Sequence, residues 1–154
     1  MNKKIIYGPY EIIKKNIIFN SKPLSLKCLG NSKFVGKAEN SLELVLTSEK
    51  ISGMQNFFEF QYISGGLIAI ISKLNNRYVC AENAGELPLA INRRMIYGTW
   101  EVFEIHDHQS DGSISLKSIS NGKFISGLSD KLLANKQKVK SDWEKFKIVN
   151  FVNF

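Results

Sequence analysis

One short sequence pattern occurs three times in this chain, in residues 22–63, 65–108 and 111–151. Each copy contains an alternating apolar run, a turn rich in Asn that is followed by a cation and an aromatic residue, and an ending similar to Trp-Glu-x-Phe. A copy of this size cannot bury its own apolar face, so the three copies must share one core. The repetition therefore constrains the architecture more than any single residue does.

Four apolar stretches in every copy have the period of two that is typical of strands. They lie at 24–27, 33–35, 44–47 and 57–60, at 68–71, 77–79, 89–92 and 100–105, and at 114–117, 123–125, 132–135 and 143–148. The first two stretches of each copy are separated by turns at 30–32, 75–76 and 121–122, where Gly, Asn and Ser tolerate positive φ and favour tight hairpins. The pattern predicts twelve strands.

Twelve strands in three units predict an all-β chain, and more specifically a single β-trefoil: a six-stranded barrel capped by three hairpins. A β-propeller is disfavoured, because propellers typically need at least about four blades to close. Residues 22–154 are expected to form this domain. The repeated aromatic residues are expected in its core by periodicity: Phe34, Phe58, Tyr78, Phe103, Phe124 and Phe146. Packing is also the favoured role of Trp100 and Trp143.

Residues 1–21 stand outside the repeat and are predicted to be an extension that packs on the barrel. Gly8-Pro9 interrupts any continuous helix there. The sequence favours an extended segment, with a short helix over 11–20 as the alternative.

Charge is distributed unevenly along the chain, which has a net charge of +7. Residues 1–21 contribute +3, the first repeat +1, the second −1 and the third +4. Because the chain ends of a closed threefold barrel lie side by side, the amino segment and the third repeat predict one basic face. No stretch approaches the roughly 18 apolar residues of a membrane span. The absence of a secretory layout and of a metal-spaced or CxxC cysteine pair indicates a cytoplasmic protein.

The sequence offers little for catalysis, and we predict a protein that is not an enzyme and uses no cofactor. It contains no Gly-x-Ser-x-Gly elbow, phosphate-binding loop or dinucleotide fingerprint. Its two histidines, His106 and His108, lie in a polar connector between the second and third repeats. A metal site there is the alternative to a solvated turn, and the turn is favoured because no third ligand is specified.

Cations give a stronger indication of function than any catalytic pattern. Five of them occupy the loop between the third and fourth strands of repeats two and three: Arg93, Arg94, Lys136, Lys138 and Lys140. Alternation would direct the three lysines to one side of an extended loop. The cluster predicts an acidic partner, although exposed lysines also serve simply as a solubilising surface.

Five segments of the second and third repeats closely resemble the repeats of fascin-like and hisactophilin-like β-trefoil domains. They are residues 75–82, 89–93, 98–105, 114–118 and 121–126. The resemblance covers about residues 22–151 and is weaker in the first repeat, where Gln55-Asn56 replaces Trp-Glu. It implies binding to filamentous actin and, as in hisactophilin, to acidic membrane lipid through many histidines. With only two histidines, this chain does not favour a pH-switched membrane contact.

The leading hypothesis is a non-catalytic binding module that docks its basic face on an acidic protein polymer of the actin type. Lys3, Lys4, Lys14 and Lys15 would assist the five loop cations. The alternative is a carbohydrate-binding lectin that uses loop pockets near Tyr97, Trp100 and Trp143, although the Gln-x-Trp signature of ricin-type repeats is absent. Nucleic-acid binding is less favoured, because the aromatics needed for stacking are expected in the core. The sequence leaves the oligomeric state open.

Overall fold

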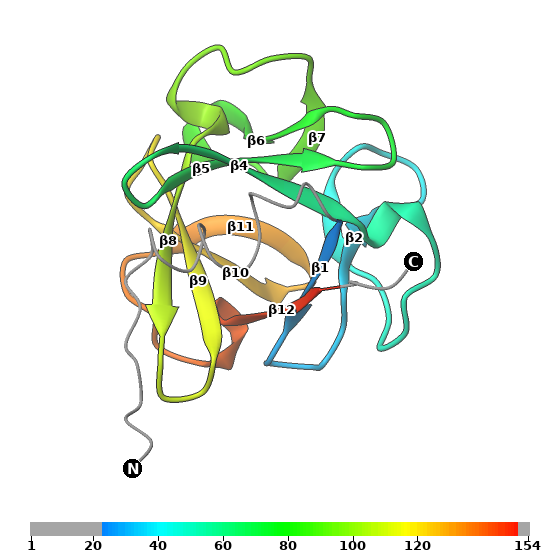
Figure 1. Ribbon diagram of the computed structural model, residues 1–154, viewed down its shortest axis with the longest axis vertical. Coiled ribbons are helices and arrows are strands. Elements are labelled where there is room, and N and C mark those ends of the chain that lie inside the picture. The colour runs from blue at the N-terminus through cyan, green and yellow to red at the C-terminus, as the bar shows by residue number, and fades with distance from the viewer. Residues whose placement is uncertain (1–22, 151–154) are drawn as a thin grey trace.

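The computed structural model describes residues 23–150, and these form strands joined by short turns and 3-10 helices (Figure 1). The strands are β1 (Leu24–Cys28), β2 (Val35–Lys37), β3 (Leu44–Leu46), β4 (Phe58–Ser64), β5 (Leu67–Ser72), β6 (Tyr78–Ala81), β7 (Leu89–Arg93), β8 (Phe103–His108), β9 (Ser113–Ser118), β10 (Phe124–Ser129), β11 (Lys131–Lys136) and β12 (Phe146–Asn150). The 3-10 helices are η3 (Met54–Asn56), η4 (Glu82–Gly85), η5 (Thr99–Glu101) and η6 (Asp142–Glu144). The prediction for residues 1–21 falls outside the described part of the chain.

Six of the strands close into a barrel. β1 pairs with β12 and β4, β5 pairs with β4 and β8, and β9 pairs with β8 and β12. Every pairing is antiparallel, and because each of the six strands pairs with two others, the ring returns to its starting strand with no open edge.

The other six strands form three hairpins, β2–β3, β6–β7 and β10–β11. They meet one another through the pairing of Val45 with Lys131 and the bridge between Glu43 and Ala90. A six-stranded barrel covered by three hairpins is the β-trefoil, so the predicted fold class is confirmed.

The turn that joins the first two strands of each repeat is stabilised in the same way three times. The side-chain oxygen of Asn accepts a hydrogen bond from the backbone N–H two residues later, at 3.0 Å in each copy, for Asn31, Asn75 and Asn121. The next residue has positive φ in every case: 61° at Ser32, 56° at Asn76 and 69° at Gly122. Asn and Gly suit such turns because they tolerate this backbone region.

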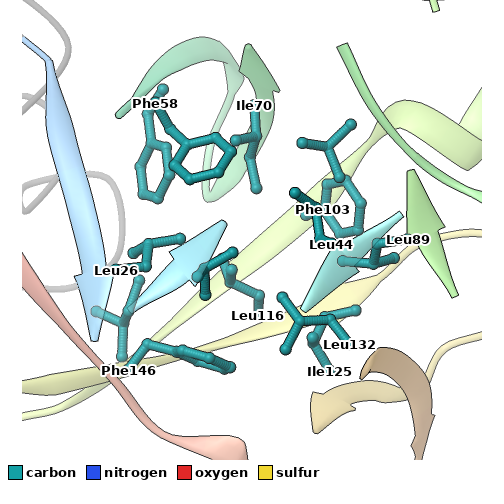
Figure 2. Close-up of a cluster of buried hydrophobic side chains, with 14 of the residues drawn as sticks. Leu26, Leu44, Phe58, Ile70, Leu89, Phe103, Leu116, Ile125, Leu132 and Phe146 are labelled. Atoms are coloured by element: carbon teal, nitrogen blue, oxygen red, sulfur yellow. The ribbon is translucent and has the colours of Figure 1, made fainter. Parts of the chain in front are cut away.

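The core follows the same threefold pattern, as Figure 2 shows for side chains from all three repeats. Its layers are the four sets Leu26, Ile70 and Leu116; Val35, Val79 and Ile125; Leu44, Leu89 and Leu132; and Phe58, Phe103 and Phe146. All of these side chains are at most 5% exposed. Phe34 and Phe124 are also buried, whereas Tyr78 is half-buried and donates its hydroxyl to Gln61 Oε1 at 2.7 Å. The core prediction is therefore confirmed for the phenylalanines.

The Trp-Glu pairs differ from prediction, because they lie on η5 and η6 before the fourth strands begin. Glu101 and Glu144 are 2% and 1% exposed, and the corresponding Asn56 of the first repeat is fully buried. Glu144 accepts hydrogen bonds from Lys140 N at 3.0 Å, Ser141 N at 3.0 Å and Ser126 Oγ at 2.8 Å. Its carboxylate thus fastens the preceding loop to β10, which explains why an acidic residue is buried there.

The first repeat has Asn56 where the third repeat has Glu144, and the residue that faces this position also differs between the two repeats. Ser126 donates to Glu144, but the corresponding residue of the first repeat is Gly36, where an added Cβ would lie 2.7 Å from Asn56 Nδ2. The Asn56 amide instead donates to Val35 O at 3.0 Å and accepts from Ser52 N at 2.9 Å. Both versions satisfy the buried polar group.

Trp143 covers Gly30 of the first repeat, so a substitution at Gly30 tests the packing between repeats. A Cβ at Gly30 would lie 2.4 Å from Trp143 Cδ2. We expect Gly30→Ala to lower the free energy of unfolding by about 1 to 3 kcal/mol, because Trp143 must shift. Urea denaturation measures this loss. Gly53→Ala is the control, since nothing lies within 4 Å of its added methyl group, and equal stability of both variants would contradict the contact.

Candidate functional site

A surface depression of about 340 Å³ lies beside the loop that joins β7 to η5. This loop crosses the top of the view in Figure 1. The depression, called here the Tyr97 depression, is lined by Arg93, Tyr97, Gly98, Thr99, Trp100 and Glu101. Tyr97 is 66% exposed and Trp100 is half-buried, so two aromatic side chains border the same hollow.

The base of the Tyr97 depression is held by the buried carboxylate of Glu101. Its Oε1 accepts hydrogen bonds from Tyr97 N at 2.5 Å and from Gly98 N at 3.0 Å. Ile96, directly before them, is half-buried. Glu144 makes equivalent contacts in the third repeat, so we assign Glu101 a structural role.

The polar wall of the Tyr97 depression is Arg93, which lines it and pairs with Glu82 beside it. Arg93 Nη1 lies 3.1 Å from Glu82 Oε1, and Nη2 lies 3.3 Å from Oε2. Asn92 Nδ2 also donates to Glu82 Oε1 at 2.6 Å. The charge of Arg93, which was predicted to face an acidic partner, is thus balanced within the protein.

Glu82 is presented by η4, whose backbone has an unusual conformation. Asn83 and Ala84 have φ of 51° and 55°, and Gly85 has φ of 91°. Left-handed conformation is uncommon for Ala, and backbone strain of this kind occurs often at functional sites. The segment is held by a hydrogen bond of 2.8 Å from Asn83 Nδ2 to Glu86 Oε2.

The Cys80 thiol lies behind this wall and is chemically inert. Burial, together with the nearby charge of Glu82, raises the pKa of Cys80 to about 12. The thiol therefore stays protonated, and it donates a weak hydrogen bond to Glu101 Oε2 at 3.6 Å. A protonated, buried thiol is neither a nucleophile nor a good metal ligand. Both Cys28 and Cys80 are free.

The other repeats lack the pair of aromatic residues that borders the Tyr97 depression. The residues that correspond to Tyr97 and Trp100 are Ser52 and Gln55 in the first repeat, and Lys140 and Trp143 in the third. Glu82 corresponds to Ala38 and Leu128, so its carboxylate is also specific to the second repeat. The chemistry of the depression arises where the copies differ.

The predicted basic residues are divided between two loops of different repeats. Arg94 is exposed on the loop after β7, whereas Lys138 and Lys140 are exposed on the loop after β11, with Lys136 half-buried at the end of that strand. Figure 1 separates these loops, with the first across the top of the view and the second, in orange, at lower left. The structure therefore brings Arg93 and Tyr97 together but not the five cations. The four lysines of the amino segment lie outside the described residues.

The two histidines lie within β8, which extends further than predicted, so that the turn itself is at 109–112. His106 Nε2 lies 2.6 Å from Glu104 Oε1, and His108 Nε2 lies 2.6 Å from the buried Ser115 Oγ. Burial and the nearby Lys145 lower the pKa of His108. Hydrogen bonds from Ser113 lower the pKa of Asp111, which pairs with Lys145 at 3.1 Å. Residues 23–150 contain no group of three or more His, Cys, Asp or Glu side chains that could hold a metal ion.

Sequence reasoning missed Glu82, which pairs with Arg93 beside the depression, and Asn92, which donates to Glu82. A signal for Glu82 was present, because a carboxylate stands where the other repeats have apolar residues. Its pairing with Arg93 depends on the conformation of η4, which the sequence pattern did not predict.

Comparisons with known proteins identify the fold and leave the family undetermined. No protein-family model and no curated protein matches the chain. Among solved structures, it is similar to ThreeFoil, a designed threefold-symmetric protein, with a TM-score of 0.71 at 13% identity over 84% of this chain and 99% of that one. It is also similar to the BEL β-trefoil, with a TM-score of 0.73 at 14% identity over 89% and 98%. A third is the lectin of Polyporus squamosus bound to the epitope Neu5Acα2-6Galβ1-4GlcNAc, with a TM-score of 0.68 at 12% identity over 84% and 49%.

Identities of this size establish the β-trefoil fold alone. The fascin-like subtype and the actin partner gain no support from these neighbours and stay predictions. In the residues that the structure describes, no helix is long and apolar enough to cross a membrane.

Proposed function

We propose that the protein is a non-catalytic carbohydrate-binding module and that the Tyr97 depression is its sugar site. The observation that carries the proposal is the meeting of Tyr97 and Trp100 with Arg93 in one hollow, where Glu82 holds the Arg93 guanidinium from beside the lining. Binding sites for small ligands typically combine aromatic walls with a few well-placed polar groups. A sugar has apolar C–H faces, which pack on aromatic rings, and a rim of hydroxyls, which hydrogen-bond to polar side chains.

The exposure of Tyr97 supports this proposal over a purely structural role. A side chain that stabilises the core buries its ring, whereas Tyr97 leaves 66% of its surface in solvent. Rigid aromatic side chains lose little conformational entropy on binding and are common anchors of recognition surfaces. The similarity of the fold to a lectin is in keeping with this proposal but does not identify a ligand.

A glycan array tests the proposal directly. We expect the fluorescently labelled protein to bind a restricted set of oligosaccharides, and a soluble form of the best ligand to compete. An array that stays blank at high protein concentration would refute carbohydrate binding.

The exposed lysines of the third repeat support a second candidate function, docking on an acidic polymer such as filamentous actin. Lys138 and Lys140 form no salt bridge with another residue in the range 23–150. Their charges are therefore available to a partner, and attraction between exposed charges is strongest at low salt.

Charge reversal of this loop is expected to abolish any such docking. The triple variant K136E/K138E/K140E should lose actin co-sedimentation at low salt while its circular dichroism spectrum is unchanged, because the attraction becomes repulsion. Lys50→Glu is a matched control, since Lys50 occupies the position of Lys138 in the first repeat. Absence of co-sedimentation by the unmodified protein at low salt would reject this second function.

A further inference from the structure

Arg93, the cation that lines the Tyr97 depression, belongs to an ion pair and is not a free cation. The two nitrogens of the Arg93 fork face the two oxygens of the Glu82 carboxylate at 3.1 and 3.3 Å. The Arg93 and Glu82 side chains are 27% and 23% exposed, so the pair is partly shielded yet reachable from solvent. A bidentate pair of this kind has a fixed geometry.

This pair leaves donors and acceptors next to each other. A guanidinium carries five N–H donors, of which Glu82 takes two. A carboxylate offers roughly four lone-pair positions, and Arg93 and Asn92 occupy three of them. The Cys80 thiol also approaches Glu82, but the carboxylate is 23% exposed and can accept a further hydrogen bond from the solvent side. A hydroxyl group both donates and accepts, so two adjacent hydroxyls can satisfy the guanidinium and the carboxylate at the same time. A carboxylate or sulfate on a sugar only accepts.

Local charge also disfavours an anionic ligand. The segment that forms the Tyr97 depression and its wall, residues 82–101, contains the carboxylates Glu82, Glu86 and Glu101 and the guanidinium groups Arg93 and Arg94, a net charge of −1 in a chain of net charge +7. An acidic sugar bound to Arg93 would place its charge beside Glu82 or displace Glu82 from its partner. Leaving a partly buried charge without its partner is costly.

We propose that the Tyr97 depression selects neutral sugars, with a pair of adjacent hydroxyls bound to the Arg93–Glu82 pair and the sugar ring packed on Tyr97 and Trp100. This inference rests on the proposed carbohydrate binding and specifies its ligand class. Glu82, which the repeat pattern did not predict to be functional, then determines the selectivity for neutral over acidic sugars.

The test uses an array of matched pairs, in which each neutral oligosaccharide is accompanied by the same oligosaccharide capped with sialic acid at the hydroxyl-bearing end or sulfated there. We expect binding to the neutral member of a pair, with an affinity that changes less than about twofold between 50 and 500 mM NaCl, because the ligand carries no charge to be screened. Stronger binding to the acidic member would overturn this inference while carbohydrate binding stands. Binding to neither member would overturn the proposed function itself.

The variant Glu82→Gln removes the charge of Glu82 while preserving the shape of the side chain, and so tests the role of the Arg93–Glu82 pair in binding. We expect its affinity for the best neutral oligosaccharide to fall about tenfold, as for the loss of a hydrogen bond to a charged group, and its preference against the acidic member to weaken. Glu49→Gln is the control, because it removes the same charge from an exposed position of the first repeat, outside the Tyr97 depression. Thermal unfolding of both variants verifies the fold. Equal effects of the two variants would show that overall charge acts in place of the pair, and would refute the assignment to Glu82.

Discussion

Glu144→Ala is expected to lower the free energy of unfolding by about 3 to 5 kcal/mol, the largest effect of any single polar substitution considered for this chain. The carboxylate is 1% exposed and accepts hydrogen bonds from Lys140 N, Ser141 N and Ser126 Oγ. Alanine leaves these donors without an acceptor and removes the tie between the loop and β10. Urea denaturation followed by tryptophan fluorescence measures the loss.

Two further variants serve as the control and as an intermediate case for Glu144→Ala. Glu49→Ala removes an exposed carboxylate and should change stability by less than about 0.5 kcal/mol. Glu144→Gln keeps one acceptor oxygen and should be intermediate, since Asn56 shows that an amide can serve at the same position of the first repeat. A loss below about 1 kcal/mol for Glu144→Ala would contradict the structural role of the buried carboxylate.

Tyr97→Ala is expected to weaken glycan binding about tenfold or more, because the substitution removes an exposed aromatic wall of the Tyr97 depression. The backbone N–H of this residue, which bonds Glu101, is unaffected by the change. Stability should therefore change little, while affinity falls. Isothermal titration calorimetry with the best array ligand measures the loss.

The control for Tyr97→Ala is Lys140→Ala, since Lys140 occupies the corresponding position in the third repeat. Its affinity for the glycan should equal that of the unmodified protein. A loss of affinity in Lys140→Ala with none in Tyr97→Ala would place the site on the third repeat and reject our assignment.

The fold could be predicted from the sequence because each of its determinants is local and occurs three times. The alternating strands, the Asn turns at Asn31, Asn75 and Asn121, and the repeated aromatic positions all favour the same barrel. The prediction was wrong where a short polar segment met a strand. Trp100 and Glu101 continue an apolar pattern in the sequence, yet they form a 3-10 turn, because the buried carboxylate of Glu101 binds the loop before it.

The candidate site could be predicted only in part. Tyr97 was predicted to lie near a loop pocket and Arg93 to belong to a cationic loop shared by repeats two and three, and the structure places both in the Tyr97 depression. The pairing of Arg93 with Glu82 depends on three successive residues of positive φ in η4, a conformation that composition and periodicity do not reveal. The single basic face was inferred from charge counts and from the meeting of the chain ends in a closed barrel. The structure places Arg94 and the lysines Lys138 and Lys140 on loops of different repeats, and the lysines of the amino segment lie outside the described residues.

The most direct test of the central claim is an NMR titration of the ¹⁵N-labelled protein with the best neutral oligosaccharide from the array. We predict amide shift changes concentrated in residues 82–101, the segment that contains Glu82, Arg93, Tyr97 and Trp100. Changes centred on residues 136–145, with the second repeat unperturbed, would contradict the assignment of the sugar site to the Tyr97 depression.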